Sequence, residues 1–304
     1  MVKEMPELSI LIPARNEMFL SKTIEDILEH IEADTEIIIG LDGGWPVPPI
    51  QDHPRIQLIY HSSSVGQRAI TNEAARLSTA PYVMKVDAHC SFDQGFDRKL
   101  LEDMQPDWTM VPVLRNLHAF DWVCSNGHRR YQGPAGPCEE CEAPTHREMV
   151  WVGKTNPQST AFRFDREMKF RYWRDYKHKQ EGELVESMSL QGSCFMVSRE
   201  RYFALNICDE AHGSWGQQGT EVACKTWLSG GRVIISKKTW YAHLFRTQTG
   251  FGFPYPNPLE LREKARKYSQ DLWLNDKWEL AIHPLAWLLD KFAPVPDWHE
   301  EGTK

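Results

Sequence analysis

Long apolar runs are missing from this 304-residue sequence, and so is an excess of basic charge. No run approaches the roughly 18 apolar residues that span a bilayer. The N-terminal stretch turns polar too early for a secretory leader, so we expect a cytosolic protein without a membrane segment. The formal charge is −7, from 35 basic and 42 acidic side chains. With 12 Trp, 13 Phe and 41% apolar residues, the composition is that of a folded globular chain.

Cysteine is also scarce, with seven residues, an odd number. Four of them stand singly among apolar neighbours, as small buried hydrophobic residues do: Cys90, Cys194, Cys208 and Cys224. A disulfide framework is therefore not expected. Internal repeats and low-complexity linkers are lacking as well, which favours one catalytic domain with an insertion.

The first ninety residues alternate between strand-like and helix-like patterns. Apolar, β-branched runs predict strands at 8–12, 36–41, 56–60 and 82–86. Helical spacing predicts helices at 22–31, capped by Ser21, and at 65–77. This alternation predicts an α/β fold with a mostly parallel sheet flanked by helices. Two further helices, with a packing role, are expected within 259–292.

Polar residues follow three of the predicted strands, at Pro13 to Glu17, Asp42 to Gly44 and Asp87 to His89. In open parallel sheets, ligands bind beyond the carboxyl ends of the strands, so these residues should meet in one crevice. One carboxylate and one imidazole suit Mn²⁺ or another borderline divalent ion. Taken alone, however, Asp87-Ala88-His89 is explained more simply as an ordinary strand end.

A series of motifs in fixed order resembles the family 2-like GT-A glycosyltransferases, and most closely the polypeptide N-acetylgalactosaminyltransferases. In the first part of the chain these motifs are SILIPARNE, IIIGLDGG and GQRAITNEAARLSTAPYVMKVDAH. In the second part they are QGSCFMVSRERYF, SWGQQGTEVACKTWLSGGRV and AHLFRTQTGFGFP. The resemblance covers roughly residues 7–117 and 187–256. It implies the Rossmann-like GT-A fold and transfer of a sugar from a UDP-sugar donor.

The resemblance also implies roles for particular residues. Asp87, His89 and His243, the last within a His-x-Phe-Arg motif, would hold Mn²⁺ or Mg²⁺. The donor would be bound by a base contact from Asp42, a diphosphate contact from Arg246, and contacts along Pro13, Ala14, Arg15 and Asn16. Asn16 and Glu17 are alternatively the start of a helix. Arg68 lies one residue from the usual basic position of the family, so it is either a second phosphate contact or a solvated helix residue.

Three residues near position 220 are candidates for contact with the transferred sugar. Trp215 opens a segment that lies over the sugar in the relatives, and Gln218 replaces their glutamate. A glutamine hydrogen-bonds hydroxyls but is not a general base, so Glu221 becomes the acidic candidate. Its alternative role is to stabilise a helix N-terminus.

The residue after Glu221 is Val222, where inverting relatives have Asp, which favours a retaining reaction. Phe251 stands where the relatives often place a phosphate-binding Tyr.

Cys124, His128, Cys138 and Cys141 offer four soft ligands within a short polar stretch, a pattern that favours a structural zinc site over free thiols. His118 and His146 are alternatives to His128.

The resemblance and the candidate zinc site together divide the chain into four parts: a nucleotide-sugar half (1–117), a zinc-binding insertion (118–150), an acceptor half (151–256) and a C-terminal helical extension (257–304).

Residues 162–179 interleave cations with aromatic rings, as nucleic-acid surfaces do, although a charged sheet edge has the same pattern. The leading hypothesis is a retaining, metal-dependent glycosyltransferase that acts on a macromolecular hydroxyl, with a hydroxymethylated base in DNA as the acceptor. The alternatives are a cytosolic transferase that acts on protein Ser or Thr, and an inactive GT-A-like nucleic-acid-binding zinc protein in which Gln218 reflects lost chemistry.

Overall fold

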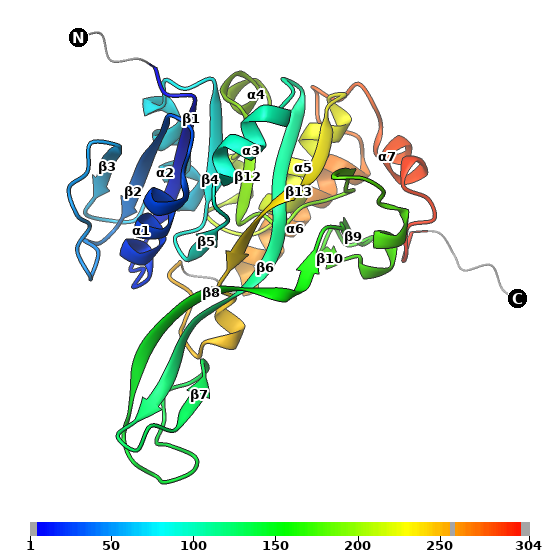
Figure 1. Cartoon of the computed structure of the whole chain (residues 1–304). Helices are drawn as coiled ribbons and strands as arrows, with labels where there is room; N and C mark the ends of the chain where they lie inside the picture. Colours follow the sequence, from blue (N-terminus) through cyan, green and yellow to red (C-terminus); the bar gives the residue numbers. More distant parts are fainter. Residues whose placement is uncertain (1–4, 256–258, 299–304) are drawn as a thin grey trace, which may run out of the picture.

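The computed structural model describes residues 5–255 and 259–298, apart from the side chain of Gln248 (Figure 1). The strands are β1 (Leu8–Ala14), β2 (Thr35–Asp42), β3 (Ile56–His61), β4 (Tyr82–Val86), β5 (Cys90–Phe92), β6 (Trp108–Cys124), β7 (Arg129–Tyr131), β8 (Thr145–Ser159), β9 (Phe162–Phe164), β10 (Phe170–Tyr172), β11 (Leu184–Glu186), β12 (Cys194–Ser198) and β13 (Arg232–His243). The helices are α1 (Leu20–His30), α2 (Gln67–Leu77), α3 (Phe96–Asp103), α4 (Arg199–Ala204), α5 (Gln218–Leu228), α6 (Leu259–Leu274) and α7 (Leu285–Lys291).

One mixed sheet carries the fold, with the strand order β11-β13-β6-β12-β4-β1-β2-β3. Strands β3, β2, β1 and β4 are parallel, as the alternating pattern predicts. Every residue of β1 and β2 is buried, because helices cover both faces of a parallel sheet. Each predicted strand and helix of this half is present, with ends that differ by up to two residues.

The predicted cap of the first helix is wrong. Helix α1 begins at Leu20, so Ser21 lies inside it and caps nothing. The Ser21 hydroxyl instead lies 3.0 Å from the carbonyl oxygens of Pro48 and Pro49. The serine therefore ties α1 to the loop between β2 and β3.

The second half of the sheet is where the antiparallel pairs occur. Strand β12 lies antiparallel between β4 and β6, and β13 runs parallel to β6. The short β5, which follows β4 after three residues, pairs with the end of β13, so that Cys90 is opposite His243. This pairing brings the ends of two strands distant in sequence to one place.

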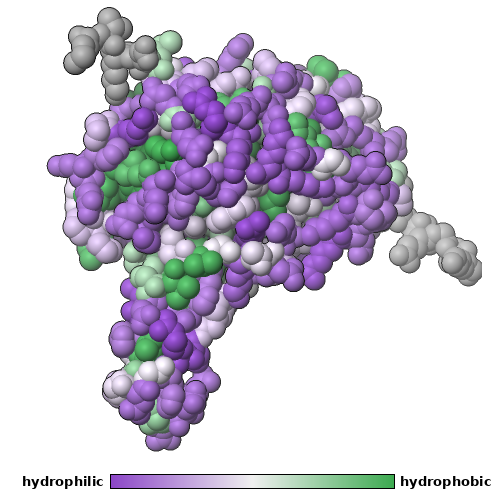
Figure 2. Space-filling view, viewed as in Figure 1, coloured by the Kyte–Doolittle hydropathy of each residue, from purple (hydrophilic) through white to green (hydrophobic). Residues whose placement is uncertain are grey.

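Strands β6 and β8 continue beyond the sheet as a long antiparallel arm, with β7 added near its outer end (Figure 1). Residues 118–150, predicted to form an insertion, make up the outer part of this arm. Its surface is largely hydrophilic (Figure 2). The predicted boundary between residues 256 and 257 lies outside the described residues. Helices α6 and α7 confirm the two helices expected after residue 258.

The cysteines follow the prediction, since Cys90, Cys194, Cys208 and Cys224 are buried and all seven thiols are free. Within residues 5–255 and 259–298, no helix combines the length and the apolar character needed to cross a bilayer.

Candidate active site

Three predicted metal ligands converge beyond the carboxyl end of β4. Asp87 follows β4, His89 precedes β5, and His243 ends β13. Their ligand atoms lie within 4.8 Å of one another, and Nε2 of His243 is 3.2 Å from Oδ2 of Asp87. The pairing of β5 with β13 produces this convergence, and the amide of Leu244 extends it by donating to the carbonyl of His89 at 3.1 Å.

The protonation states at this cluster suit metal binding. Burial raises the pKa of Asp87, but the adjacent Lys85 ammonium and His243 outweigh this and hold it well below its usual range. Burial lowers the pKa of His243 to about 4, so that imidazole is neutral at pH 7. An ionised carboxylate beside a neutral imidazole is a donor pair that suits a transition-metal site.

Glu17 supports this cluster from behind. Nδ1 of His89 lies 3.0 Å from Oε2 of Glu17, so Nε2 of His89 is free to face a metal. The same carboxylate oxygen accepts from the guanidinium of Arg246. Burial raises the pKa of Glu17, but His89 and Arg246 outweigh this effect and bring the pKa below its usual value. The carboxylate is therefore ionised. One buried carboxylate thus orients both a metal ligand and a candidate phosphate ligand.

A cavity of about 190 Å³ opens on this cluster. Pro13, Ala14 and Arg15, at the end of β1, line it together with Arg246 and Tyr255. The Nε of Arg246 is buried without a hydrogen-bond partner in the described part of the chain. A guanidinium with a free donor in the lining of a cavity is suited to a polar, anionic ligand.

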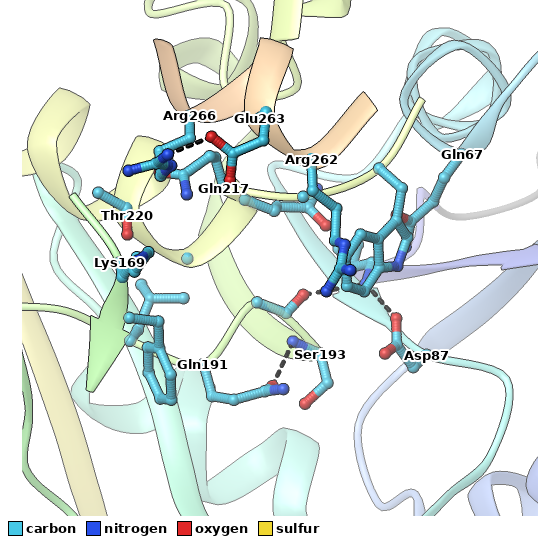
Figure 3. Close-up of a pocket in the computed structure, with 18 of the residues that line it drawn as sticks. Gln67, Asp87, Lys169, Gln191, Ser193, Gln217, Thr220, Arg262, Glu263 and Arg266 are labelled. Atoms are coloured by element: carbon cyan, nitrogen blue, oxygen red, sulfur yellow. Dashed lines mark hydrogen bonds and ion pairs between the residues drawn. The ribbon is translucent and has the colours of Figure 1, made fainter. Parts of the chain in front are cut away.

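A second cavity has a volume of about 530 Å³, and Asp87 lies in its lining as well (Figure 3). Both are lined by Gln67, Asp87, Gln191 and Trp215. The charged side chains that line the larger cavity are four cations and two carboxylates: Lys85, Lys169, Arg262, Arg266, Asp87 and Glu263. Lys85 contacts Asp87, and Glu263 contacts Arg266. No ion partner of Arg262 is found among the described residues.

Asp42, the predicted base contact, lines neither cavity. It is completely buried at the end of β2, where its carboxylate accepts from the Ser64 hydroxyl at 2.8 Å and from the amides of Val65 and Gly66 at 2.6 and 3.0 Å. The carboxylate therefore holds the turn that precedes α2. Asn16 is exposed and also lies outside the cavity lining.

Arg68 and Glu221 are brought together, but behind the cavities and not in them. The Arg68 guanidinium lies 2.9 Å from the Glu221 carboxylate, and both side chains are completely or almost completely buried. Arg68 also donates to the carbonyls of Gly213 and Gly216, and Lys225 lies 2.8 Å from Glu221. This arrangement replaces the predicted phosphate and sugar contacts with a buried network that holds the loop carrying Trp215.

The other sugar-contact candidates differ in their positions. Trp215 lines both cavities, as its predicted role requires. Gln218 lines the larger cavity and donates to Sγ of Cys208 at 3.1 Å. Phe251 lines neither; its ring packs 5.7 Å from that of Phe120 and 6.1 Å from that of Phe19, at the root of the arm.

Most of segment 162–179 does not form the predicted nucleic-acid surface. Phe162, Phe164 and Trp173 are buried in the main core and are not available for stacking. The cations have partners close by, among them Arg171 with Asp165 and Arg163 with Asp297. The alternation of rings and cations is therefore the pattern of a small sheet with one buried face.

Glu17, Lys85 and Tyr255 were missed as site residues. Glu17 is included among the polar residues expected at the crevice and, alternatively, at the start of a helix, but the sequence assigns it no contact of its own. Lys85 had a visible signal, since a lysine inside the apolar run of β4 is costly to bury without a partner. Tyr255 follows the last recognisable motif and had none.

Comparisons with known proteins bear on this site. Residues 9–134 match the family described as Glycosyl transferase family 2. This match covers less than half of the chain, and the architecture described above is that of the GT-A fold. The chain is similar to the mouse polypeptide N-acetylgalactosaminyltransferase 4, with 23% identity over 290 residues, 90% of this chain and 45% of the relative. Similarity to the Drosophila melanogaster polypeptide N-acetylgalactosaminyltransferase 3 is 23% over 223 residues, 73% of this chain and 30% of that protein.

The fold matches the crystal structure of GalNAc-T7 with UDP, GalNAc and Mn²⁺, with a TM-score of 0.62 and 16% identity over 91% of this chain and 49% of that one. The chain thus spans less than half the length of each of these relatives. The match supports the GT-A fold predicted from the motifs.

Proposed function

We propose that this domain transfers a sugar from a UDP-sugar to a hydroxyl group, with Mn²⁺ bound by Asp87, His89 and His243. The observation that carries the proposal is the position of these three ligands in the wall of the smaller cavity, beside Arg246 and its unpartnered Nε. The ligand set fits the ion, since His89 is oriented by Glu17 and His243 is neutral. A bound divalent cation would neutralise charge on the departing pyrophosphate.

The residues of the chain divide the remaining work between the two cavities. The smaller cavity takes the nucleotide, with Arg246 positioned for the diphosphate and Pro13 to Arg15 along the base and ribose. The relatives named in the comparisons support this placement, because the solved structure is a complex with UDP, GalNAc and Mn²⁺. The larger cavity takes the sugar and the acceptor, because Asp87 lines both cavities.

We further propose that the reaction retains the configuration of the sugar. An inverting reaction needs a carboxylate base facing the acceptor. The carboxylates lining the larger cavity, within the described residues, are Asp87 and Glu263, and each is engaged with a cation. Glu221 is buried behind the wall. The C1–O bond to the β-phosphate then breaks as the acceptor oxygen bonds C1 on the same face, and the acceptor proton passes to the departing phosphate oxygen.

The acceptor that the relatives support is a protein Ser or Thr hydroxyl, since both are polypeptide transferases by name. A hydroxymethylated base in DNA is the second candidate. The observation in its favour is the cationic lining of the larger cavity, to which Lys169, Arg262 and Arg266 contribute (Figure 3).

The test is a donor screen followed by an acceptor screen. A panel of UDP- and GDP-sugars, with and without Mn²⁺, is assayed for a rise in Tm and for release of the nucleotide. We expect one UDP-sugar to be consumed only with Mn²⁺, and its turnover to be lost in Asp87→Asn and His243→Ala variants that keep their fold. If no donor binds or is consumed, the inactive nucleic-acid-binding alternative replaces this proposal.

With the active donor, labelled transfer to peptide pools is compared with transfer to hydroxymethylated DNA. Transfer to peptides alone would remove the DNA candidate. A steep loss of acceptor binding with rising salt concentration would favour DNA as the acceptor. The anomeric configuration of the product, determined by NMR, tests retention; an inverted product would overturn that part.

A further inference from the structure

A second cluster of metal ligands lies far from the candidate active site, at the outer end of the arm. Cys124 is the last residue of β6, His128 directly precedes β7, and Cys138 and Cys141 follow in the next loop. Backbone hydrogen bonds fold this loop around the side chains: Gly127 donates to the carbonyl of Cys124 at 3.0 Å, and Glu142 to that of Cys138 at 2.9 Å. The four ligand atoms lie within 4.8 Å of one another.

The spacing of these atoms is that of a tetrahedral zinc site. With Zn–S bonds of about 2.3 Å and Zn–N bonds of about 2.0–2.1 Å, two sulfurs lie about 3.8 Å apart, and a sulfur and a nitrogen about 3.5 Å apart. Sγ of Cys124 is 3.7 Å from Sγ of Cys141, and Nδ1 of His128 is 3.5 Å from Sγ of Cys138. A disulfide requires about 2.05 Å, so Cys124 and Cys141 are not bonded. We propose that Cys124, His128, Cys138 and Cys141 bind one structural zinc ion.

The geometry also chooses among the three histidines of the arm. His118 is engaged by Asp121, at 2.6 Å from its Nε2, and His146 is exposed and lies outside the cluster. His128 directs Nδ1 at Cys138, while its Nε2 lies 3.6 Å from a carboxylate oxygen of Glu140. A carboxylate on the second nitrogen of a ligating imidazole is the usual outer support of a zinc site.

The arm has little else to hold its end together. Between residues 125 and 144, the buried positions are Gln132, Gly133 and Cys138. A loop that buries so little apolar surface does not recover the entropy lost on ordering. Zinc coordination supplies the missing free energy, because all four ligands come from this one loop and its flanks.

The zinc ligands also clamp a segment that supports the candidate donor site. His128 and Cys138 flank residues 129–137, which run back along the arm, where the Gln132 side chain bonds the backbone of Leu117 and Ala119. Pro134 then packs directly against Gly250, where a Cβ atom would lie 2.5 Å from the Pro134 Cα. Gly250 lies between Arg246 and Tyr255, which line the smaller cavity. Zinc binding therefore fixes both ends of the segment that packs against Gly250. Calling the smaller cavity the donor site depends on the proposed function, whereas zinc binding does not.

The first test is metal content in the full chain, purified with zinc and without manganese. We expect one zinc per chain in the native protein and in His243→Ala, which separates this site from the candidate manganese site. A Cys124→Ser/Cys138→Ser double variant should lose the zinc, and the matched control His146→Ala, on the same arm, should keep it. Zinc-free native protein after reconstitution, or zinc retained by the double variant, would overturn the proposal.

Cobalt provides a spectroscopic test that does not depend on a folded variant. Removing zinc from the native chain with a chelator and adding Co²⁺ should give the thiolate-to-cobalt charge-transfer band and the visible d–d bands of a tetrahedral thiolate site, and added zinc should abolish them. Absence of the charge-transfer band would contradict cysteine ligation.

Hydrogen exchange tests the link to the candidate donor site. Zinc removal should increase amide exchange in 125–144 and also in 246–255, while β3 at the far edge of the sheet stays unchanged. Unchanged exchange in 246–255 would overturn the supporting role and leave the zinc site in place. Metal content, cobalt spectra and hydrogen exchange are all measured without a donor, so these tests are independent of the proposed transferase activity.

Discussion

Nδ1 of His89 lies 3.0 Å from Oε2 of Glu17, 72 residues earlier in the chain. Outer-shell carboxylates of this kind fix the tautomer and direction of a ligating imidazole. We therefore expect Glu17→Ala to weaken Mn²⁺ binding by about 10- to 100-fold, the usual loss when such a partner is removed. Titration calorimetry, or EPR of free Mn²⁺, measures the change.

The control for this variant is Glu73→Ala. Glu73 also pairs with a histidine, His61, at 2.7 Å, but on the half-exposed side of α2 and away from both cavities. It should bind Mn²⁺ as the native chain does. Native affinity in a folded Glu17→Ala protein would show that His89 is oriented without Glu17.

The buried network around Glu221 makes a prediction about acid stability. Burial raises the pKa of Glu221, but Arg68 and Lys225 outweigh it and lower the pKa from 4.5 to about 2. Because the pKa of the folded state lies below that of the unfolded state, the network stabilises fully above about pH 4.5, and its contribution is lost as the pH falls toward 2. Glu221→Gln leaves two buried cations without their partner, so we expect a loss of about 3–5 kcal/mol at pH 7.

Urea unfolding at a series of pH values measures both effects. The free energy of unfolding of the variant should fall less steeply than that of the native chain between pH 4.5 and 2. Glu25→Gln, which removes an exposed carboxylate paired with Lys22, should leave the curve nearly unchanged. An acid limb in Glu221→Gln as steep as the native one would assign the acid sensitivity to other groups.

Local sequence was sufficient for the elements, because each strand of the first half is a short apolar run between polar turns. The limits of β4 are the predicted ones, Tyr82–Val86. The helix start at Leu20 was missed, because a serine at the edge of an apolar pattern normally indicates a cap, whereas the Ser21 hydroxyl is used by the loop at Pro48 and Pro49.

The candidate site was only partly predictable, because it depends on long-range pairing. Nothing near His243 indicates that it meets Asp87, 156 residues earlier, and the resemblance to a family alone suggested it. Arg68 and Glu221 were interpreted as separate contacts, since residues 153 positions apart give no sign that they neutralise each other. Charged residues in helices are normally solvated, and only the packing of α2 against the loop before α5 buries this pair.

Gly219, in the first turn of α5, tests how tightly the wall of the larger cavity is built. A Cβ atom there would lie 2.0 Å from the carbonyl oxygen of Leu190, which is backbone and cannot rotate away. We expect Gly219→Ala to destabilise the fold by about 3 kcal/mol or more, at the upper end of overpacking effects. Thermal unfolding measures it.

Gly252→Ala is the matched control, because no atom of residues 5–255 and 259–298, its chain neighbours apart, lies within 4 Å of the position of its Cβ. Its Tm should equal or slightly exceed that of the native chain, since alanine restricts the unfolded state. A Gly219→Ala protein as stable as this control would mean that the loop at Leu190 moves freely, and that the cavity wall is not rigid.

Tyr255 is the aromatic residue best placed to contact the base of a nucleotide. It is 6% exposed and lines the smaller cavity with Arg15. Stacking of a base on an aromatic ring contributes about 1–3 kcal/mol. Tyr255→Ala should therefore weaken UDP binding, measured by calorimetry with Mn²⁺ present, by about 5- to 150-fold.

Tyr255→Phe separates the ring from the hydroxyl: near-native affinity assigns the effect to stacking, and a loss as large as that of Tyr255→Ala assigns it to the hydroxyl. Tyr60→Ala, on the exposed edge strand β3, should bind UDP normally. Native affinity in Tyr255→Ala would exclude Tyr255 from the nucleotide site and require the base to lie elsewhere along β1.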